Sequence, residues 1–410
     1  MSKTVLIVGR TFKELSDYLK KQGFNAYYLR DSKYYDAKDA NFPDIPVDFF
    51  DETELFRAVD EINNNVKIDV AMTLYENYVV ASAKIAEHLG IPGMPIEAAE
   101  ACTDKLLMRQ KFAASPEKIS PDFTIANSQD DVRDFAENHS FPLIIKPANL
   151  SASLLVYKNR TLDELMENFA HALELAPKIY AKFAPHSQPR LLIEEFMEGS
   201  VHSVDAYVDK SGNVQILKNI VDCTTGYEVG FDDNFHYSLI TPTRLSPDSQ
   251  EELRHCAELG VKSLGMRSSP AHIEIIMTRE GPRLVEIGAR NGGYRHKMHC
   301  LANGLDLYGT WIKTVLGENI DIMPKKNDSV AFIHLHPYQK GIFREIKNVD
   351  SLKRLPSFYD FHTLVNPGDL VGKGSDGFKN SALIILHNPD ERQFAEDLDY
   401  IRKNVSVVIE

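Results

Sequence analysis

Apolar runs alternate with amphipathic segments in the N-terminal part of the chain. Thr4–Val8 is a continuous run rich in β-branched residues, typical of a strand buried on both faces, and Phe12–Lys21 gathers its apolar side chains on one helical face. The pattern predicts further strands at 25–29 and 69–74 and helices at 54–62 and 79–89. Strands that alternate with helices favour a parallel sheet, so we expect one open α/β unit that ends at the Gly- and Pro-containing segment Leu89–Met94.

The middle of the chain continues with longer helices and two hairpins. Strands are predicted at 141–146 and 190–196, and helices at 96–113, 161–175, 249–264 and 305–316. One hairpin joins 203–208 to 214–221, and a second joins 271–277 to 283–287. From about Asp328, short strands at 330–335, 382–386 and 405–409 and a helix at 391–403 indicate a small α+β unit.

Composition excludes several classes of protein. Hydrophobic residues make up 43% of the 410 residues, which is enough for sizeable cores in more than one unit. The net charge of −13 leaves no excess of cations for a nucleic-acid partner. The four cysteines form no CxxC pair, and the apolar run Val5–Val8 is cut by Arg10 and is too short for a secretory signal or a membrane span. We therefore expect a cytoplasmic enzyme without a membrane partner.

Two glutamates carry the clearest chemical signal. Glu274 and Glu286 each interrupt an apolar strand pattern, and a short turn joins the two strands, so their carboxylates are expected to face each other. Such carboxylates are costly to bury unless they are paired or bind a metal, and Mg²⁺ commonly bridges carboxylates and substrate phosphates. Arg290 follows, before Asn291-Gly292-Gly293, where it can meet a phosphoryl oxygen. The alternative is a surface hairpin with one salt bridge, which the apolar surroundings disfavour.

Two lysines and a strand end upstream fit a nucleotide. Lys146 ends an apolar strand and Lys105 lies on a helix. Each lysine alone is explained by a side chain that reaches solvent. Together with the acidic pair, the two lysines supply the cations that ATP phosphates need. The strand end Glu194–Gly199 offers extended backbone to the edge of an adenine, with Phe196 and Met197 beside the ring.

The order of these parts resembles the ATP-grasp superfamily, and among its members the biotin-carboxylase-like carboxylate–amine ligases, which include the L-amino acid (dipeptide) ligases. The matching segments are Asp104-Lys105 with Met108, Ile144–Pro147, Glu194–Gly199, Ser203–Asp205, His272–Glu274 and Glu286–Gly293. The resemblance implies an ATP-grasp fold of the α/β and α+β classes. It has an N-terminal pre-ATP-grasp domain (1–98), an ATP-grasp domain (99–325) with a lid subdomain at about 120–198, and a C-terminal α+β cap (326–410).

The resemblance also implies roles for single residues. The residues that it places around ATP are Lys105, Lys146, Ser151, Ser153, Glu194, Glu195, Phe196, Met197 and His202. Glu274 and Glu286 are expected to bind Mg²⁺, with Mn²⁺ as an alternative ion. Arg290 is the expected catalytic residue, which stabilises the transferred phosphoryl group and the tetrahedral intermediate.

This sequence departs from the family pattern in three places. The loop expected to cover the triphosphate is poor in glycine and reads Asn149-Leu150-Ser151-Ala152-Ser153. The metal-binding Asn expected two residues after Glu286 is Gly288, so a second Mg²⁺ lacks a ligand, or Asn291 or water substitutes for it. The acidic ribose contact is replaced by Val201, and the adjacent His202 is expected to take that role.

The implied reaction joins a small-molecule carboxylate to an amine through an acyl phosphate, with amino acids as the expected substrates. The segment 223–241, which contains His236, and the residues Arg295 and His296 are candidate substrate contacts; an exposed loop and a solvated helix surface are the competing explanations. Two other functions stay open: a purine-pathway or biotin-type carboxylating enzyme, and an ATP-binding regulatory protein without turnover. A homodimer is one option for the assembly.

Overall fold

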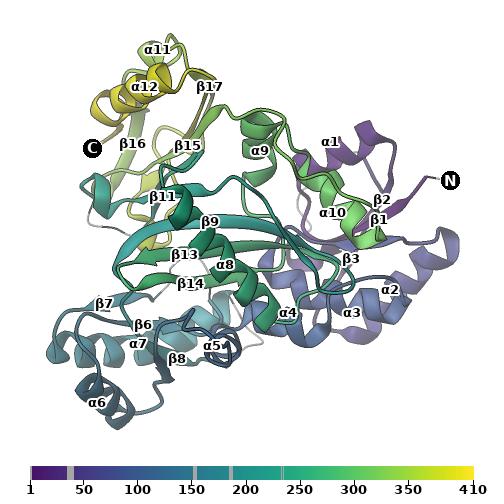
Figure 1. Ribbon diagram of the computed structural model, residues 1–410, viewed down its shortest axis with the longest axis horizontal. Helices are drawn as coiled ribbons and strands as arrows, with labels where there is room; N and C mark the ends of the chain where they lie inside the picture. The colour runs from purple at the N-terminus through teal and green to yellow at the C-terminus, as the bar shows by residue number, and fades with distance from the viewer. Residues whose placement is uncertain (1, 35–40, 151–154, 184–187, 232, 234) are drawn as a thin grey trace.

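The computed structural model describes residues 2–34, 41–150, 155–183, 188–231, 233 and 235–410. These residues form an N-terminal α/β unit, a lid subdomain, and a body built on one long antiparallel sheet (Figure 1). None of the helices in these ranges combines the length and the apolar character that crossing a lipid bilayer demands.

The N-terminal unit is a parallel sheet covered by helices, as predicted. Its described strands run in the order β3-β2-β1-β4, with bounds β1 Thr4–Gly9, β2 Asn25–Asp31, β3 Asp44–Val47 and β4 Val70–Met72. Its helices are α1 Lys13–Gln22, α2 Glu52–Asn65 and α3 Val79–Leu89, with short 3₁₀ turns at η1 Ser32–Tyr34 and η2 Glu76–Tyr78. Every residue of β1 is buried, which explains its unbroken apolar sequence.

The single helix predicted at 96–113 is wrong, because Asp104 divides it. The backbone of Asp104 is extended, and its side chain accepts hydrogen bonds from the backbone N–H groups of Leu106 and Leu107. Asp104 therefore ends α4 (Ile96–Thr103) and caps the N-terminus of α5 (Lys105–Ala113). The break makes Lys105 the first residue of a helix.

The lid subdomain is a small antiparallel sheet with two helices. Its described strands have the order β5-β8-β6-β7, with bounds β5 Phe123–Ile125, β6 Leu143–Pro147, β7 Tyr157–Asn159 and β8 Leu191–Glu195. The helices are α6 Gln129–Asn138 and α7 Leu162–Phe183. The backbone N–H of Glu164 donates to Thr161 Oγ1, so Thr161 caps α7, and the helix is longer than the predicted range 161–175.

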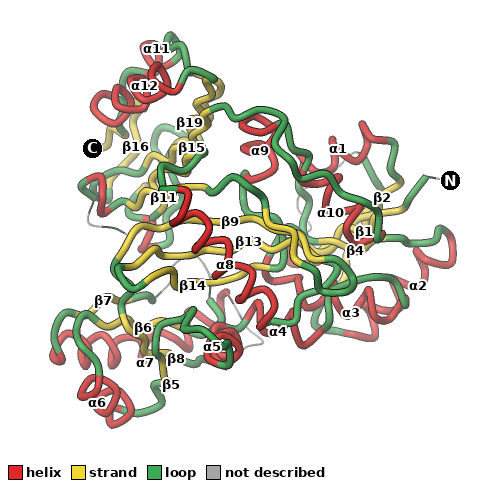
Figure 2. Tube along the Cα trace, in the orientation of Figure 1, coloured by secondary structure: helices red, strands yellow, loops and turns green. Residues whose placement is uncertain are grey.

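The body contains the predicted hairpins in one continuous sheet. Its described strands follow the order β14-β13-β9-β11-β12-β15-β19-β17, with β10 paired to β9. The bounds are β9 Gly199–Val208, β10 Val214–Ile216, β11 Val221–Thr225, β12 His236–Thr241, β13 Ser269–Thr278, β14 Gly281–Gly288, β15 Ser329–Leu335, β17 Phe358–Thr363 and β19 Ala382–Asn388. Helix α8 (Pro247–Ser263) crosses one face of this sheet, and η3 (Tyr227–Val229), α9 (Arg295–Asn303) and α10 (Leu307–Leu316) complete the body (Figures 1 and 2).

The C-terminal section is joined to the body more closely than the sequence suggests. Strand β15 pairs with β12, so the long sheet continues across the predicted boundary at residue 325. Beyond it, a second small sheet has the order β18-β16-β20. Its strands and the remaining elements are β16 Gly341–Ile346, β18 Leu370–Val371, β20 Val407–Ile409, α11 Val349–Leu352, η4 Gly374–Asp376 and α12 Glu391–Asn404.

Candidate active site

Glu274 on β13 and Glu286 on β14 are direct partners in the antiparallel ladder. Their neighbours Ile273 and Ile287 are fully buried in the core beneath α8, because side chains alternate between the two faces of a strand. The two carboxylates share the other face, where 21% of the Glu274 side chain and 39% of the Glu286 side chain are exposed. Two accessible carboxylates on facing strands fit the oxygen ligands that Mg²⁺ prefers.

Lys105 joins the acidic pair to the loop expected to cover the triphosphate. Its Nζ lies 3.1 Å from Glu286 Oε2 and donates to the carbonyl of Leu150 at 3.1 Å. The charge of Lys105 lowers the pKa of Glu286. Burial acts to lower the pKa of Lys105, but the nearby carboxylate of Glu286 has the larger effect, so the pKa of the lysine is raised. The predicted contacts Ser151 and Ser153 lie outside the described residues.

Lys146, Glu194 and Arg109 form a buried ionic cluster, called here the lid cluster. Lys146 Nζ lies 2.6 Å from Glu194 Oε2, and Arg109 Nε donates to Glu194 Oε1 at 2.9 Å. Arg109 also donates to the carbonyl of Val285 on β14, which ties the lid strands to the body. Burial lowers the pKa of Lys146 to about 8. Both oxygens of Glu194 are engaged by cations, so Glu194 holds the lysine in place rather than standing free at the predicted adenine edge.

The predicted adenine strand connects the lid to the body. Glu195 Oε2 accepts a hydrogen bond from the backbone of Asp122 at 2.9 Å, and Lys158 Nζ lies 3.6 Å from the centre of the Phe196 ring. Met197 follows between β8 and β9 and is half-buried.

His202, the predicted ribose contact, is buried. Its ring nitrogens lie 2.9 Å from Asp222 Oδ1 and 2.7 Å from Ser200 Oγ. Both nitrogens therefore have partners with which a ribose hydroxyl would have to compete.

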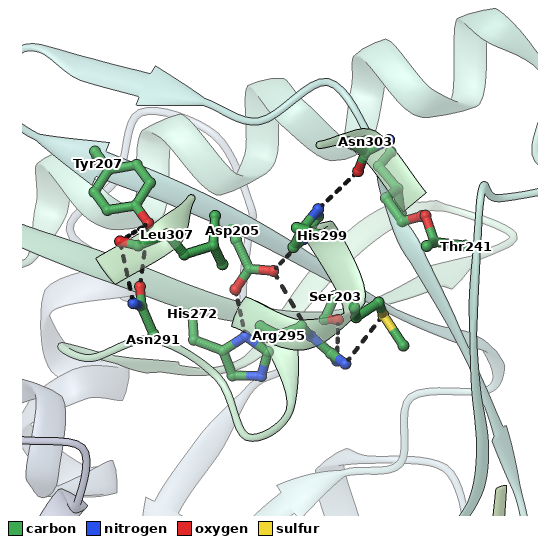
Figure 3. A network of polar contacts seen from close by, with 12 residues as sticks. Ser203, Asp205, Tyr207, Thr241, His272, Asn291, Arg295, His299, Asn303 and Leu307 are labelled. Atoms are coloured by element: carbon green, nitrogen blue, oxygen red, sulfur yellow. Dashed lines mark hydrogen bonds and ion pairs between the residues drawn. The ribbon is translucent and has the colours of Figure 1, made fainter. Parts of the chain in front are cut away.

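A second buried cluster, called here the core cluster, consists of Asp205, His272, Arg295 and His299 (Figure 3). Asp205 is 2.8 Å from His272 Nδ1, 3.2 Å from His299 Nε2 and 3.6 Å from Arg295 Nε. Burial alone would raise the pKa of Asp205, but His272, the hydrogen bond with His299 and the charge of Arg295 hold it well below its usual range. The other ring nitrogen of His272 lies 3.7 Å from Glu274 Oε1, so the cluster also orients a predicted metal ligand.

The candidate substrate residues separate in the structure. Arg295 belongs to the core cluster, with its guanidinium donating to Ser203 Oγ at 2.7 Å, so it is not a free cation for a substrate carboxylate. His296, the next residue on α9, points elsewhere: its ring stacks on Tyr308 at 3.8 Å, and burial lowers its pKa to about 4.

His236 begins β12 and lies within electrostatic reach of Glu274. Burial acts to raise the pKa of Glu274, but the hydrogen bond with His272 and the electrostatic effect of His236 both lower it. The pKa of Glu274 is therefore lowered on balance. His236 therefore remains a candidate substrate contact close to Glu274.

Arg290 has a partner that the sequence did not indicate. Its Nε donates to Glu76 Oε2 at 2.9 Å, and Glu76 comes from η2 of the N-terminal unit. Arg290 is therefore held at the junction between that unit and the hairpin of Glu274 and Glu286.

A small antiparallel lid sheet, together with a body that carries paired carboxylates on the β13–β14 hairpin, is the arrangement expected for an ATP-grasp fold. A family model described as the ATP-grasp domain matches residues 139–297, and one described as the ATP-grasp N-terminal domain matches residues 31–93. The chain belongs to the ATP-grasp superfamily.

Similar proteins include ligases of amino acids. The chain is 26% identical over 275 residues to an alanine–anticapsin ligase of Bacillus subtilis, covering 64% of this chain and 55% of that protein. An L-arginine-specific L-amino acid ligase of the same species is 22% identical, with 84% of this chain and 82% of that protein covered. The chain spans about 55 to 60% of the length of the curated relatives it matches first.

A solved structure of an L-amino acid ligase from Bacillus licheniformis has the same fold. The two chains superpose with a TM-score of 0.84 at 18% identity, over 100% of this chain and 99% of the other. The expected ATP-grasp fold is thus confirmed over the whole sequence, including the section after residue 325.

Several residues around the acidic pair were not predicted from the sequence. Asp205 and His272 lay in the family-like segments and interrupt apolar strands, which is a usable signal for a buried polar role. Arg109 gave no such signal, because a single arginine on a short helix is most often solvated. Glu76 and His299 join the region only through contacts between distant parts of the chain.

Proposed function

We propose that this protein is an ATP-dependent carboxylate–amine ligase that forms an amide bond between amino acid substrates and releases ADP and phosphate. The observation that carries the proposal is the facing pair of Glu274 and Glu286, with Lys105 in contact with it. The amino acid ligases among the similar proteins support the choice of substrate class.

The proposed reaction has two steps. An oxygen of the substrate carboxylate attacks the γ-phosphorus of ATP, and the bond from this phosphorus to the bridging oxygen breaks, so that ADP leaves. The nitrogen of the amine then attacks the carbonyl carbon of the acyl phosphate. The bond from that carbon to the phosphate oxygen breaks, inorganic phosphate leaves, and the nitrogen loses a proton.

The chain's charged residues suit this chemistry, which depends on positioning and charge neutralisation. Lys105 and Lys146 would neutralise phosphate oxygens, and Arg290 would stabilise the charge that develops on the transferred group. Glu274 and Glu286 would hold Mg²⁺, which neutralises phosphate charge when bound. The lid would exclude water from the acyl phosphate.

An ADP-release assay over a panel of amino acids, offered singly and in pairs with Mg²⁺, tests the proposal. We expect release that depends on a pair of amino acids, and a product whose mass is that of the pair less one water. Release that depends on bicarbonate would favour a carboxylating enzyme instead. ATP binding without release for any substrate would favour a regulatory protein.

A further inference from the structure

Gly288 contributes no side chain to the face that carries Glu286. Side chains two residues apart on a strand point to the same side, so a side chain at residue 288 would project beside the Glu286 carboxylate. A Cβ atom there would lie 3.1 Å from Glu76 Oε2 and 3.7 Å from Arg290 Cζ. The backbone of Gly288 does not require a glycine, because its φ lies outside the left-handed region. The glycine therefore serves to make room for Glu76.

Glu76 brings a carboxylate oxygen that has no partner of its own. Oε2 is bound by Arg290, but Oε1 is buried and accepts no hydrogen bond from the described residues. A buried, unsatisfied carboxylate oxygen is costly unless a ligand completes it. Burial raises the pKa of Glu76, and the charge of Arg290 opposes this rise. The charge of Glu286 raises the pKa further, whereas that of Lys105 lowers it. Glu76 thus lies within electrostatic reach of the predicted metal ligand.

Asn291, the substitute considered from the sequence, is turned away. Its Oδ1 accepts from Tyr207 Oη at 3.4 Å, and its Nδ2 donates to the carbonyl of Leu307 at 3.5 Å. These contacts hold the amide against α10, buried beneath the N-terminus of that helix. Among the described atoms nearest to the position of a side chain at residue 288, the oxygen is Glu76 Oε2, which Arg290 binds, and Oε1 of the same carboxylate is the oxygen left without a partner.

We propose that Glu76 supplies, from the N-terminal unit, the oxygen ligand for a second divalent cation that Gly288 cannot provide. The proposal rests on the proposed function, because it requires a nucleotide whose phosphates complete the coordination. It assigns to the N-terminal unit a direct part in the metal site. Binding of the second ion would then require this unit to be docked against the hairpin of β13 and β14.

Titration of Mn²⁺ followed by electron paramagnetic resonance, with a non-hydrolysable ATP analogue present, tests this without turnover. We expect the wild-type protein to bind a second Mn²⁺, and Glu76→Ala to weaken that second site by roughly 10- to 100-fold, the effect typical of lost ligand support. Glu87→Gln, an exposed carboxylate of the same unit, is the matched control and should leave both sites unchanged.

A double variant separates a ligand from a merely structural residue. In Glu76→Ala with Gly288→Asn, the shortened residue 76 leaves room for an amide oxygen beside Glu286, and the second Mn²⁺ should return although Arg290 still lacks its partner. Glu76→Gln keeps an acceptor for Arg290 and should weaken the second site less than Glu76→Ala does.

Two results would overturn the inference while leaving the proposed function intact. One is a wild-type protein that binds nucleotide with a single Mn²⁺. The other is a Glu76→Ala protein that binds the second ion as the wild type does. A wild-type protein that binds neither nucleotide nor Mn²⁺ would instead reject the proposed function together with the inference.

Discussion

The lid cluster and the core cluster are both buried groups of charges, but they are balanced differently. In the lid cluster one carboxylate, Glu194, faces the two cations Lys146 and Arg109, and Nη1 of Arg109 is buried without a hydrogen bond from the described residues. In the core cluster two carboxylates, Asp205 and Glu274, lie beside one arginine, Arg295, and the two histidines His272 and His299. Nε of Arg295 also donates to none of the described residues, but it lies 3.6 Å from Asp205 Oδ2, and the guanidinium donates to Ser203 Oγ.

The two clusters differ in the number of carboxylates: the lid cluster has one for a lysine and an arginine, whereas the core cluster has two for one arginine and two histidines. We therefore expect the lid cluster to accept a further anion. A surplus of buried positive charge is unfavourable until a ligand such as a phosphate neutralises it. The lid cluster also links strands of the lid to the body, so an anion bound there would act on both parts. The core cluster connects two neighbouring strands to α9 and fixes the position of Glu274. Changes in the first should therefore alter nucleotide binding, and changes in the second should alter stability.

The largest effect should come from the carboxylate pair of Glu274 and Glu286, which the core cluster contacts through His272. Glu286→Gln removes the charge that would hold the metal, and we expect turnover to fall by roughly 10³-fold, the scale of a lost electrostatic contact in a transition state. The thermal unfolding midpoint should stay close to that of the wild type, because Glu286 is half-exposed. ADP release and thermal unfolding measure the two quantities. Full activity in this variant would remove Glu286 from the metal site.

Asp205→Asn tests whether the core cluster is structural. The substitution leaves Arg295 and His272 buried without their shared anion, and we expect a loss of about 3 to 5 kcal/mol in the free energy of unfolding. Urea unfolding measures this loss. Glu280→Gln, in the exposed turn of the neighbouring hairpin, should change the free energy by no more than about 0.5 kcal/mol. Equal stability of the two variants would contradict the comparison.

Lys146→Ala tests whether the lid cluster binds the nucleotide rather than stabilising the fold. Glu194 keeps its partner Arg109, so the fold should remain, while the dissociation constant for ATP should rise roughly 10- to 100-fold for the loss of one charged contact. Calorimetric titration measures the affinity, and Lys111→Ala, exposed on the same helix as Arg109, is the control. An unchanged affinity would remove Lys146 from the nucleotide site.

The smallest effect concerns pH. Burial lowers the pKa of Lys146 from its ordinary 10.5 to about 8. The lysine is charged below this value, so ATP affinity should be full there and should fall by up to about tenfold per pH unit above it. Between pH 8 and pH 10.5, Lys146 is protonated in the unfolded chain but largely neutral in the folded protein. Its contribution to the free energy of unfolding therefore increases as the pH rises through this range. The Lys146→Arg variant should keep its positive charge, so its ATP affinity should not change over this pH range. If the ATP affinity of the wild type and of the variant fell in parallel, the pH dependence would belong to another group.

Local patterns in the sequence were sufficient for much of the fold. The pairing of Glu274 with Glu286 followed from two apolar strands and the short turn between them, and the parallel sheet followed from alternating strands and helices. The division of the helix at Asp104 could have been found, because Asp is a preferred N-cap residue. Arg295 and His296 were expected together near the substrate, but neighbouring helical residues point about 100° apart, and the structure places the two side chains in different surroundings.

The contacts that assemble the site could not be derived from one sequence. Arg109 meets Glu194, Asp205 meets His272, and Arg290 meets Glu76 across long separations in the chain. Each pair depends on how the units pack, which periodicity does not encode. The sequence showed that Gly288 lacks the expected side chain, but only the structure shows which residue fills the space.

The pairing of β15 with β12 bears on how the chain can be divided. A protein that ended at the predicted boundary after residue 325 would leave β12 with an open row of backbone N–H and C=O groups. Such bare strand edges pair with other copies of the same chain and lead to aggregates. The C-terminal section therefore covers this edge of β12, and the region that matches the ATP-grasp domain model, residues 139–297, is not a unit to be produced alone.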